Sequence, residues 1–279
     1  MLVEIDGSML EGGGQILRMS IALSAVTGVP IRVFNIRAKR KDPGLKAQHM
    51  TAIKAVASLV DAEVKGLALR SQELFFKPRT IKSGSFKFDV GTAGSTTLVL
   101  QSLLPAAAFA PSRVHVEVTG GTDNPLAPPV DYIDSVLRPL VAKMGYYPKG
   151  GGIVKASMLP VVKLMPIKLE EQGDVKIIRG VSYSSRLPDH IARRMANSAS
   201  RILRDSGFDV DIKLEILQPG HPKCALNPGC GIVLWAETTK GLVLGADSLG
   251  EIGKPAEKVG EEAAKKLLDE INGEATVDR

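Results

Sequence analysis

The segment Glu11-Gly-Gly-Gly-Gln-Ile-Leu-Arg18 joins a short strand-like run, Leu2 to Ile5, to a run with helical periodicity. In that second run, apolar and small side chains recur three or four residues apart from Ile16 to Val26, which predicts an amphipathic helix. Gly28 follows at a common position for a helix stop. The stretch therefore predicts a strand, a glycine turn and a helix in succession.

The same order of elements returns further along the chain. We expect a strand at Phe86 to Val90, a turn at Gly91 to Ser95, and a helix at Thr96 to Phe109 that Pro105 should kink or interrupt. Residue identity between the two copies is low, so the repeat is one of pattern. It predicts an α+β fold with repeated units rather than a single wound sheet.

The remaining elements follow from the same periodicities. Beyond Gly180 the pattern of elements changes, which predicts a separate, smaller α/β domain of roughly 90 residues, followed by residues 272–279 that form no element. Strands are expected at Ile31 to Ile36, Val114 to Thr119, Asp209 to Leu217, Ile232 to Thr239 and Leu242 to Ala246, and helices at Leu45 to Val60, Val130 to Met144, Pro188 to Ser206 and Pro255 to Ile271.

The net charge and the aromatic content of the chain indicate which kinds of ligand it can bind. The 279-residue chain has a formal net charge of +6, and only 4% of its residues are aromatic, which argues against binding that depends on base stacking. Cations cluster between Arg32 and Lys46, as expected of a phosphate-binding surface or of a solvated loop. No signal peptide and no apolar run of membrane-spanning length is evident, so we expect an intracellular, cytoplasmic protein that does not engage membranes.

The glycine turn is the first candidate site. Gly12, Gly13 and Gly14 leave backbone N–H groups free to face an anion at a helix start, and Arg18 could bind a phosphate with two N–H groups. Glu11 could hold a divalent metal or orient a phosphate-bound water. The turn is not a P-loop, because no Gly-Lys-Ser/Thr follows. A tight structural turn with a surface Glu and Arg is the alternative.

The basic loop that enters the next helix is the second candidate site. Arg37, Arg40 and Gln48 could converge on a nucleotide or RNA phosphate. His49 is interpreted as a partly buried helix residue.

Two further segments combine small or rigid residues with single polar groups. Gly91 to Gln101 allows close backbone approach, and packing alone would explain all of it except Gln101. In the segment Gly120 to Asp131, Pro128 belongs to a proline face that could pack on a purine. Asp131 could accept from an exocyclic amine or simply cap a helix.

His221, Cys224 and Cys230 are residue types that can bind zinc and lie close together in the sequence. Their spacing matches no common zinc pattern, so a flexible loop is favoured and the role of the two cysteines stays open.

Taken in order, these segments resemble the RNA 3′-terminal phosphate cyclase family. The resemblance extends through Gly145 to Gly152, Leu187 to His190 and Gly253 to Glu257, so it covers nearly the whole chain. It implies a core of repeated units, each with two helices on a small sheet, as in the enolpyruvate transferases. This core would comprise residues 1–179 plus 272–279, and the smaller α/β domain at residues 180–271 would be inserted in its third repeat. The family resemblance also implies a ligase that uses ATP and a divalent metal, Mg or Mn. That enzyme would convert an RNA 3′-phosphate into a 2′,3′-cyclic end through enzyme–AMP and RNA–adenylate intermediates.

The resemblance also implies roles for individual residues. The phosphate-binding set is Gly12, Gly13, Gly14, Arg18, Arg37, Arg40 and Gln48, with Glu11 beside the AMP phosphate or metal; Gln101, Pro128 and Asp131 would line the nucleotide pocket. Of these, Glu11, Arg18, Arg40 and Gln48 would support catalysis. The partner would be RNA with a 3′-phosphate. The oligomeric state is left open, with a homodimer as one option.

One departure from the family pattern concerns the nucleophile. In the family, the adenylated histidine lies near the C-terminus, whereas none of His49, His115, His190 and His221 matches its motif. We therefore expect a truncated cyclase, and expect no enzyme–AMP adduct on this 279-residue chain; a stable phosphoramidate from radiolabelled ATP would contradict this. The rival readings are a non-catalytic cyclase-like factor in ribosomal RNA processing and an enolpyruvate transferase.

Overall fold

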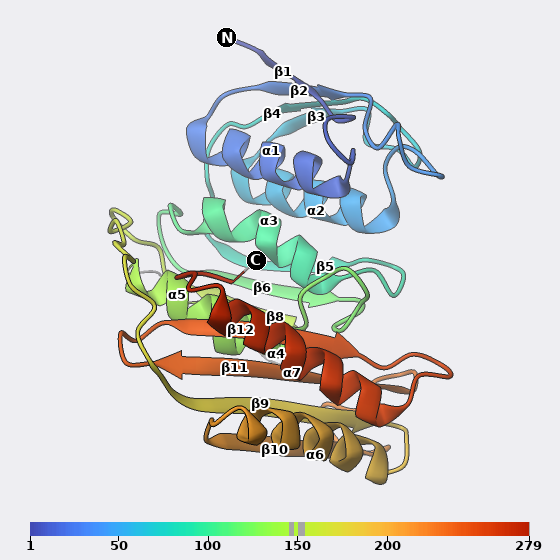
Figure 1. Ribbon diagram of the computed structural model, residues 1–279. Helices are drawn as coiled ribbons and strands as arrows, with labels where there is room; N and C mark the ends of the chain where they lie inside the picture. The colour runs from blue at the N-terminus through green and yellow to red at the C-terminus, as the bar shows by residue number, and fades with distance from the viewer. Residues whose placement is uncertain (145–147, 150–153, 279) are drawn as a thin grey trace. The chain divides into compact units, whose positions relative to one another are not determined.

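The computed structural model describes residues 1–144, 148–149 and 154–278 (Figure 1). The chain forms two compact units. The first comprises residues 1–127 and 145–164, and the second comprises residues 128–144 and 165–279. Mixed helices and sheets confirm the predicted α+β class. The predicted signature Gly145 to Gly152 lies largely outside the described residues.

The first unit contains a sheet with the strand order β1-β2-β4-β3. Its strands are β1 (Val3–Asp6), β2 (Ile31–Phe34), β3 (Glu63–Lys65) and β4 (Leu74–Lys77). β1 and β2 run parallel, and β4 is antiparallel to both β2 and β3. The parallel pair needs a crossover, which α1 (Gly14–Thr27) supplies. β3 and β4 were not expected from the sequence.

A second sheet completes the first unit, in the order β5-β6-β8-β7. It comprises β5 (Gly84–Asp89), β6 (Val114–Thr119), β7 (Pro148–Lys149) and β8 (Val154–Met158). In β6, buried valines at 114, 116 and 118 alternate with more exposed residues, the pattern of a strand with one buried face. α3 (Thr96–Ala107) is the crossover between the parallel strands β5 and β6, and Pro105 lies inside it.

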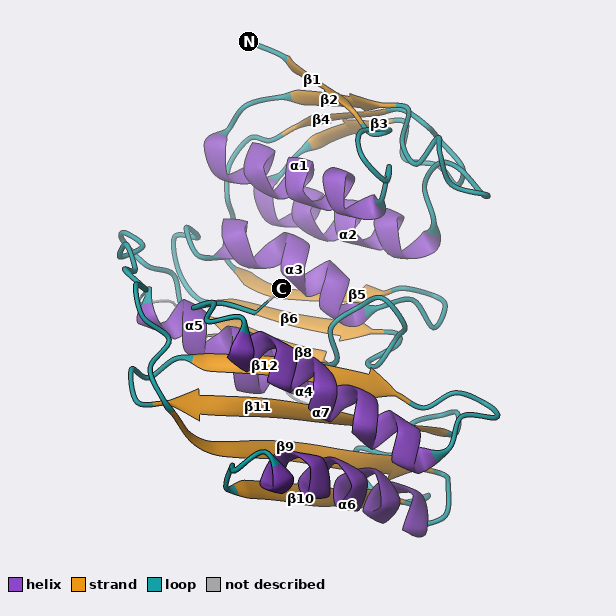
Figure 2. Ribbon diagram, in the orientation of Figure 1, coloured by secondary structure: helices purple, strands orange, loops and turns teal. Residues whose placement is uncertain are grey.

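Three helices lie between the two sheets of the first unit (Figure 2). α1, α2 (Ala47–Val60) and α3 pack on one another. Their contact faces are almost fully buried, with Ile21, Ile53 and Leu103 at 0–1% exposure. This packing sets the N-termini of the three helices close to one another, which matters for the site below.

The second unit is built on the sheet β10-β9-β11-β12. Its strands are β9 (Val175–Ser185), β10 (Val210–Leu217), β11 (Gly229–Thr238) and β12 (Val243–Leu249). α6 (His190–Asp205) and α7 (Ala256–Asn272) pack together over one face, around Met195, Leu234 and Leu267. The helices and the hairpin agree with the sequence to within a few residues, but β9 was missed.

The helix expected at Val130 to Met144 is present in three parts. α4 (Val130–Tyr132) passes into a π-helical segment (Ile133–Leu137) and then into α5 (Arg138–Lys143). Val136 packs against Gly245 of β12, on the face opposite the one that Ala246 turns toward α7. The domain boundary expected between residues 179 and 180 lies within β9, and the division into a repeated core and an inserted domain stays a prediction.

Candidate functional site

The glycine turn begins α1 without a side-chain cap. Gly13 is the N-cap residue of α1 and has an extended backbone. Because glycine has no side chain, no side-chain oxygen accepts a hydrogen bond from the first N–H groups of the helix. Gly12 has φ of +60°, a conformation that costs a residue with a Cβ more than it costs glycine. The first N–H groups of a helix lack intrahelical partners, so this turn presents donors and the positive end of the helix dipole.

Gly14 lies where two basic side chains meet. A Cβ added at this position would lie 2.2 Å from His49 Nε2 and 3.1 Å from Arg18 Nη1. Only glycine leaves room for both groups, because real Cβ contacts are not that short. The two nitrogen atoms therefore face the same small space at the start of α1.

Arg18 is only partly exposed and has an unsatisfied donor. Among the described residues its Nε is buried without a hydrogen-bond partner. Burial lowers the pKa of its guanidinium below the usual value, although an arginine stays protonated at neutral pH. A buried cation with a free N–H group is costly unless an anion binds it.

Arg40 brings the basic loop to the glycine turn. Its Nη2 lies 3.1 Å from Glu11 Oε2, and the two side chains are 43% and 87% exposed. The same nitrogen would lie 3.4 Å from a Cβ on Gly13. At such exposure the ion pair contributes little to stability, so Arg40 is free to exchange Glu11 for another anion.

Arg37 braces the loop that carries Arg40. Its Nη1 donates to the carbonyl oxygens of Asp42 (2.8 Å) and Gly44 (2.9 Å). Burial and the nearby Arg40 lower its pKa. Part of its donor set is thus committed to loop structure, a role that the sequence did not suggest.

His49 lies at the start of α2 and is 3% exposed. Its Nδ1 accepts a hydrogen bond from the backbone N–H of Lys46 at 3.1 Å. Burial, together with the charges of Arg37, Arg18 and Lys46, lowers the pKa of His49 to about 3. The ring is therefore neutral at pH 7, and because Nδ1 is the acceptor, Nε2 carries the proton. The predicted position of His49 on a helix is confirmed, and the side chain is buried more completely than the sequence predicted.

Gln48 connects α2 to the second glycine turn. Its Oε1 accepts from the backbone N–H of Ser95 at 3.2 Å. Ser95 in turn caps α3, because its Oγ accepts from Leu98 N at 3.2 Å. A Cβ on Gly94 would lie 2.9 Å from Val90 Cγ1 and 3.1 Å from the Cβ of Gln48, so a larger residue here would force these side chains to shift.

The segment that begins at Gly120 closes on the same turn. Thr96 Oγ1 donates to Gly121 O at 2.9 Å, and Asn124 Nδ2 donates to Ala93 O at 2.5 Å. A continuous set of contacts thus runs from Glu11 through Arg40, the glycine turn, His49 and Gln48 to this segment. Sequence reasoning missed the contribution of Ser95, Thr96 and Asn124, whose partners are distant in sequence.

Three predicted residues are not joined to this set. Gln101 is half-buried on α3, and no hydrogen bond links it to the other described site residues. Pro128 and Asp131 belong to the second compact unit. There, Lys223 has a raised pKa, first because of its bond to Glu215 and, more weakly, because of Asp131. The nucleotide contacts of all three stay predictions.

The sequence contains two candidate metal sites, one at His221, Cys224 and Cys230 and one at Glu11. The described residues contain no group of three or more His, Cys, Asp or Glu side chains that could hold a metal ion. His221 Nδ1 instead accepts from Lys223 N at 3.2 Å, and Cys224 Sγ lies 3.6 Å from Ser185 Oγ. Glu11 is a single carboxylate, which suits a metal ion carried in by phosphates.

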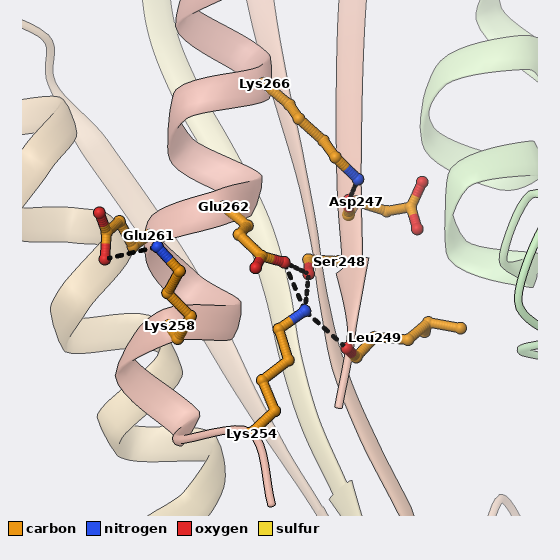
Figure 3. A network of polar contacts seen from close by, with 8 residues as sticks. All are labelled: Asp247, Ser248, Leu249, Lys254, Lys258, Glu261, Glu262 and Lys266. Carbon is orange, nitrogen blue, oxygen red and sulfur yellow. Dashed lines mark hydrogen bonds and ion pairs between the residues drawn. The ribbon is translucent and has the colours of Figure 1, made fainter. Parts of the chain in front are cut away.

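The predicted signature at Gly253 to Glu257 makes polar contacts within the second unit. Lys254 Nζ reaches Ser248 Oγ, the carbonyl of Leu249 and Glu262 of α7 (Figure 3). Glu257 accepts two hydrogen bonds from Arg194 of α6, at 2.6 and 2.7 Å. These contacts tie the start of α7 to β12 and α6.

The second unit also holds a cavity of about 220 Å³. It lies between the helical segment 130–143, the turn at Gly241 and the residues Thr276 to Asp278. Asp278 accepts from Tyr132 Oη and from Gly245 N, and burial raises the pKa of this carboxyl. None of the predicted site residues lines it.

The fold and the site together define a class of protein: an α+β protein in which helix N-termini and basic side chains gather, as in proteins that handle phosphorylated ligands. A family model described as RNA 3′-terminal phosphate cyclase matches residues 9–279. The chain belongs to this family. No helix among the described residues is long and apolar enough to cross a membrane.

Curated relatives agree with the family match. The chain is 53% identical to the RNA 3′-terminal phosphate cyclase of Ignicoccus hospitalis, over all of this chain and 82% of that protein. It is 50% identical to the protein of that name in Hyperthermus butylicus, over all of this chain and 81% of the relative. The protein of that name in Methanopyrus kandleri is 47% identical over 97% of this chain and 80% of its own length.

Proposed function

We propose that this chain acts in the ATP-dependent conversion of an RNA 3′-terminal phosphate into a 2′,3′-cyclic phosphodiester, with the phosphates held at the start of α1. The observation that carries the proposal is the meeting of Gly14, Arg18 and His49, where donors converge and the buried Arg18 Nε lacks a partner. The names of the relatives supply the reaction; the geometry supports phosphate binding.

The chemistry of the reaction needs such a site. A phosphate monoester is a poor electrophile, and adenylation of the RNA 3′-phosphate turns AMP into a leaving group. The vicinal 2′-hydroxyl then attacks the 3′-phosphorus, the cyclic ester forms, and AMP departs. Charge on the transferred groups must be offset throughout, mainly by fixed donors and cations.

Arg18, Arg40 and the free N–H groups of α1 would offset that charge. Gln48 would hold the turn at Gly91 to Ser95 against α2, because its side chain accepts a hydrogen bond from the backbone N–H of Ser95. This contact would keep the phosphate-binding site in shape. A Mg or Mn ion would fit beside Glu11 only together with phosphate oxygens and water, since that carboxylate stands alone and pairs with Arg40. When bound, it would neutralise phosphate charge.

His49 is unsuited to be the adenylated nucleophile. Its Nδ1 lone pair accepts from Lys46, and its Nε2 carries the proton against Gly14. Covalent chemistry at either nitrogen would require the ring to leave its position. We therefore assign to this region of the chain the binding of phosphates and not the formation of the enzyme–AMP bond.

Binding and turnover test the proposal separately. We expect the protein to bind ATP, and to bind an RNA oligonucleotide with a 3′-phosphate more tightly than the same RNA with a 3′-hydroxyl. Arg18→Ala should weaken ATP binding by about tenfold or more, because a charge-assisted hydrogen bond contributes about 1.5–3 kcal/mol. Arg79→Ala is the matched control, since Arg79 lies in the same unit and lies 3.9 Å from both Asp61 and Glu63.

Failure to bind ATP would refute the proposal. Binding of RNA without binding of ATP would favour the non-catalytic cyclase-like factor, since such a scaffold need not bind ATP. Turnover of phosphoenolpyruvate would instead indicate a transferase.

A further inference from the structure

We infer that His49 is an anion-binding residue, whose neutral ring donates its Nε2–H to the phosphate held at the start of α1. The inference rests on the proposed function of that site, and it assigns to His49 a role beyond packing. Its basis is the direction of the ring and the donors that surround it.

The tautomer of His49 is fixed by the backbone. The backbone N–H of Lys46, the N-cap residue of α2, donates to Nδ1 of His49 at 3.1 Å. His49 is the third residue of the helix, and a side chain at this position often accepts a hydrogen bond from the N-cap N–H in a capping box. The proton must then reside on Nε2, which points at Gly14. The ring edge that reaches the glycine turn is therefore a donor.

Donor groups of two side chains face the space beside Gly14. His49 Nε2 and Arg18 Nη1 would lie 2.2 and 3.1 Å from a Cβ on Gly14, so the two nitrogens are near one another. No hydrogen bond joins His49 Nε2 to a described residue. Gly13, the N-cap, also provides no side-chain acceptor for the first N–H groups of α1. Converging donors of this kind are satisfied together by one anion.

The surrounding charges explain why a histidine is suited here. Burial, and after it the positive charges of Arg37, Arg18 and Lys46, lowers the pKa of His49 and keeps the imidazole neutral. A neutral ring supplies a directed N–H group without adding a further buried charge to repel Arg18 in the absence of ligand. Glycine at 14 is what lets the ring approach the helix start.

Two substitutions separate the donor from the cap. Asparagine places its Oδ1 near the position of the histidine Nδ1, so His49→Asn can keep the bond from Lys46 but loses the donor at Nε2. Glutamine reaches the Nε2 position, so His49→Gln can keep a donor there. We expect His49→Asn to weaken binding of inorganic tripolyphosphate about tenfold or more, and His49→Gln to recover part of that loss.

Titration calorimetry with tripolyphosphate gives the affinities, and thermal unfolding checks that each variant is folded. Arg18→Ala is measured in parallel. If Arg18→Ala leaves tripolyphosphate binding unchanged, the proposed phosphate site itself fails. If Arg18→Ala weakens binding while His49→Asn binds as the wild type does, only the inference about His49 is overturned.

A measurement on the wild-type protein is independent of the folding of any variant. Nitrogen-15 and proton NMR of the histidine rings should show the His49 Nε2–H resonance moving downfield as tripolyphosphate is added. Movement of the Gly14 to Arg18 backbone amides without any change at Nε2–H would overturn the inference.

Discussion

At the scale of single residues, the start of α1 depends on a glycine that leaves space and on a histidine that points into that space. Gly14 has no Cβ, and this absence is what brings His49 Nε2 and Arg18 Nη1 to the same space. The sequence suggested the turn and Arg18, but not the contact with His49. Two residues that are 35 positions apart meet only because α1 and α2 pack side by side, and no local pattern encodes that.

Gly14→Ala tests the close approach directly. The new methyl group would meet His49 Nε2 at 2.2 Å, so the ring or the helix start must shift. We expect a loss of about 1–3 kcal/mol in the free energy of unfolding and weaker tripolyphosphate binding. Gly13→Ala is the matched control, because the nearest atom to its Cβ would be the flexible end of Arg40 at 3.4 Å, and Gln15 N would lie at an ordinary contact distance of 3.9 Å. Equal effects of the two substitutions in urea unfolding would contradict the account.

His49 also predicts a pH dependence of stability. Its pKa is about 3 in the folded protein, against 6.5 for the free side chain, because of burial and the charges of Arg37, Arg18 and Lys46. The unfolded chain therefore binds a proton below about pH 6.5 that the folded chain does not. This contribution to stability is complete above that pH and falls on acidification toward about pH 3.

Comparison of the wild type with His49→Asn isolates this effect. Between about pH 7 and about pH 4 the wild type should lose about 3 kcal/mol more than the variant. Urea midpoints measured across this range provide the check. Parallel pH profiles would mean that the ring titrates normally in the folded protein.

At the scale of elements, most helices and several strands could be predicted because their periodicity is strong. Val114 to Thr119 matches β6 residue for residue, and Gly28 ends α1 with φ of +72°. β9 was missed because its C-terminal half reads as polar, with Ser182, Ser184 and Ser185. These serines are buried, and the hydroxyl of Ser182 donates to Ala192 O. Hydrogen bonds satisfy the buried hydroxyls of Ser182 and Ser185, whereas Ser184 Oγ is buried without a partner among the described residues, and none of the three gives the apolar pattern that sequence reasoning requires.

The contact between α6 and α7 yields a prediction of its own. A Cβ on Gly260 would lie 2.1 Å from the carbonyl oxygen of Met195, so Gly260→Ala should push the helices apart. We expect about 1–3 kcal/mol of destabilisation in the second unit. Arg194→Ala should cost less than about 1 kcal/mol, because its pair with Glu257 is exposed.

Trp235, the single tryptophan, lies on β11 of the same unit and reports its unfolding by fluorescence. A Gly260→Ala protein as stable as the wild type would show that α6 and α7 can separate at little cost.

At the scale of the whole molecule, the predicted site residues fall in both compact units. Glu11 to Gln101 belong to the first, and Pro128 and Asp131 belong to the second. Sequence reasoning could name both groups through family resemblance. It could not derive their spatial relation from the residues, since contacts across such separations in the chain leave no periodic signal.

The proposed role of Asp131 predicts a change in base selectivity. If its carboxylate accepts from the exocyclic amine of adenine, Asp131→Ala should weaken ATP binding and leave tripolyphosphate binding unchanged. Asp134→Ala is a neighbouring control, because the carboxylate of Asp134 pairs with Arg138 at 2.7 Å. Calorimetry with ATP, GTP and tripolyphosphate measures the difference. Unchanged preference for ATP over GTP in Asp131→Ala would remove this residue from the nucleotide site.

The central claim is that the glycine turn, the basic loop and the start of α2 hold one phosphate group in common. A crystal structure of the protein grown with ATP tests it most directly. The account predicts phosphate density within hydrogen-bond distance of Arg18, His49 Nε2 and the first N–H groups of α1. Phosphates bound elsewhere, with Arg18 and His49 untouched, would contradict it.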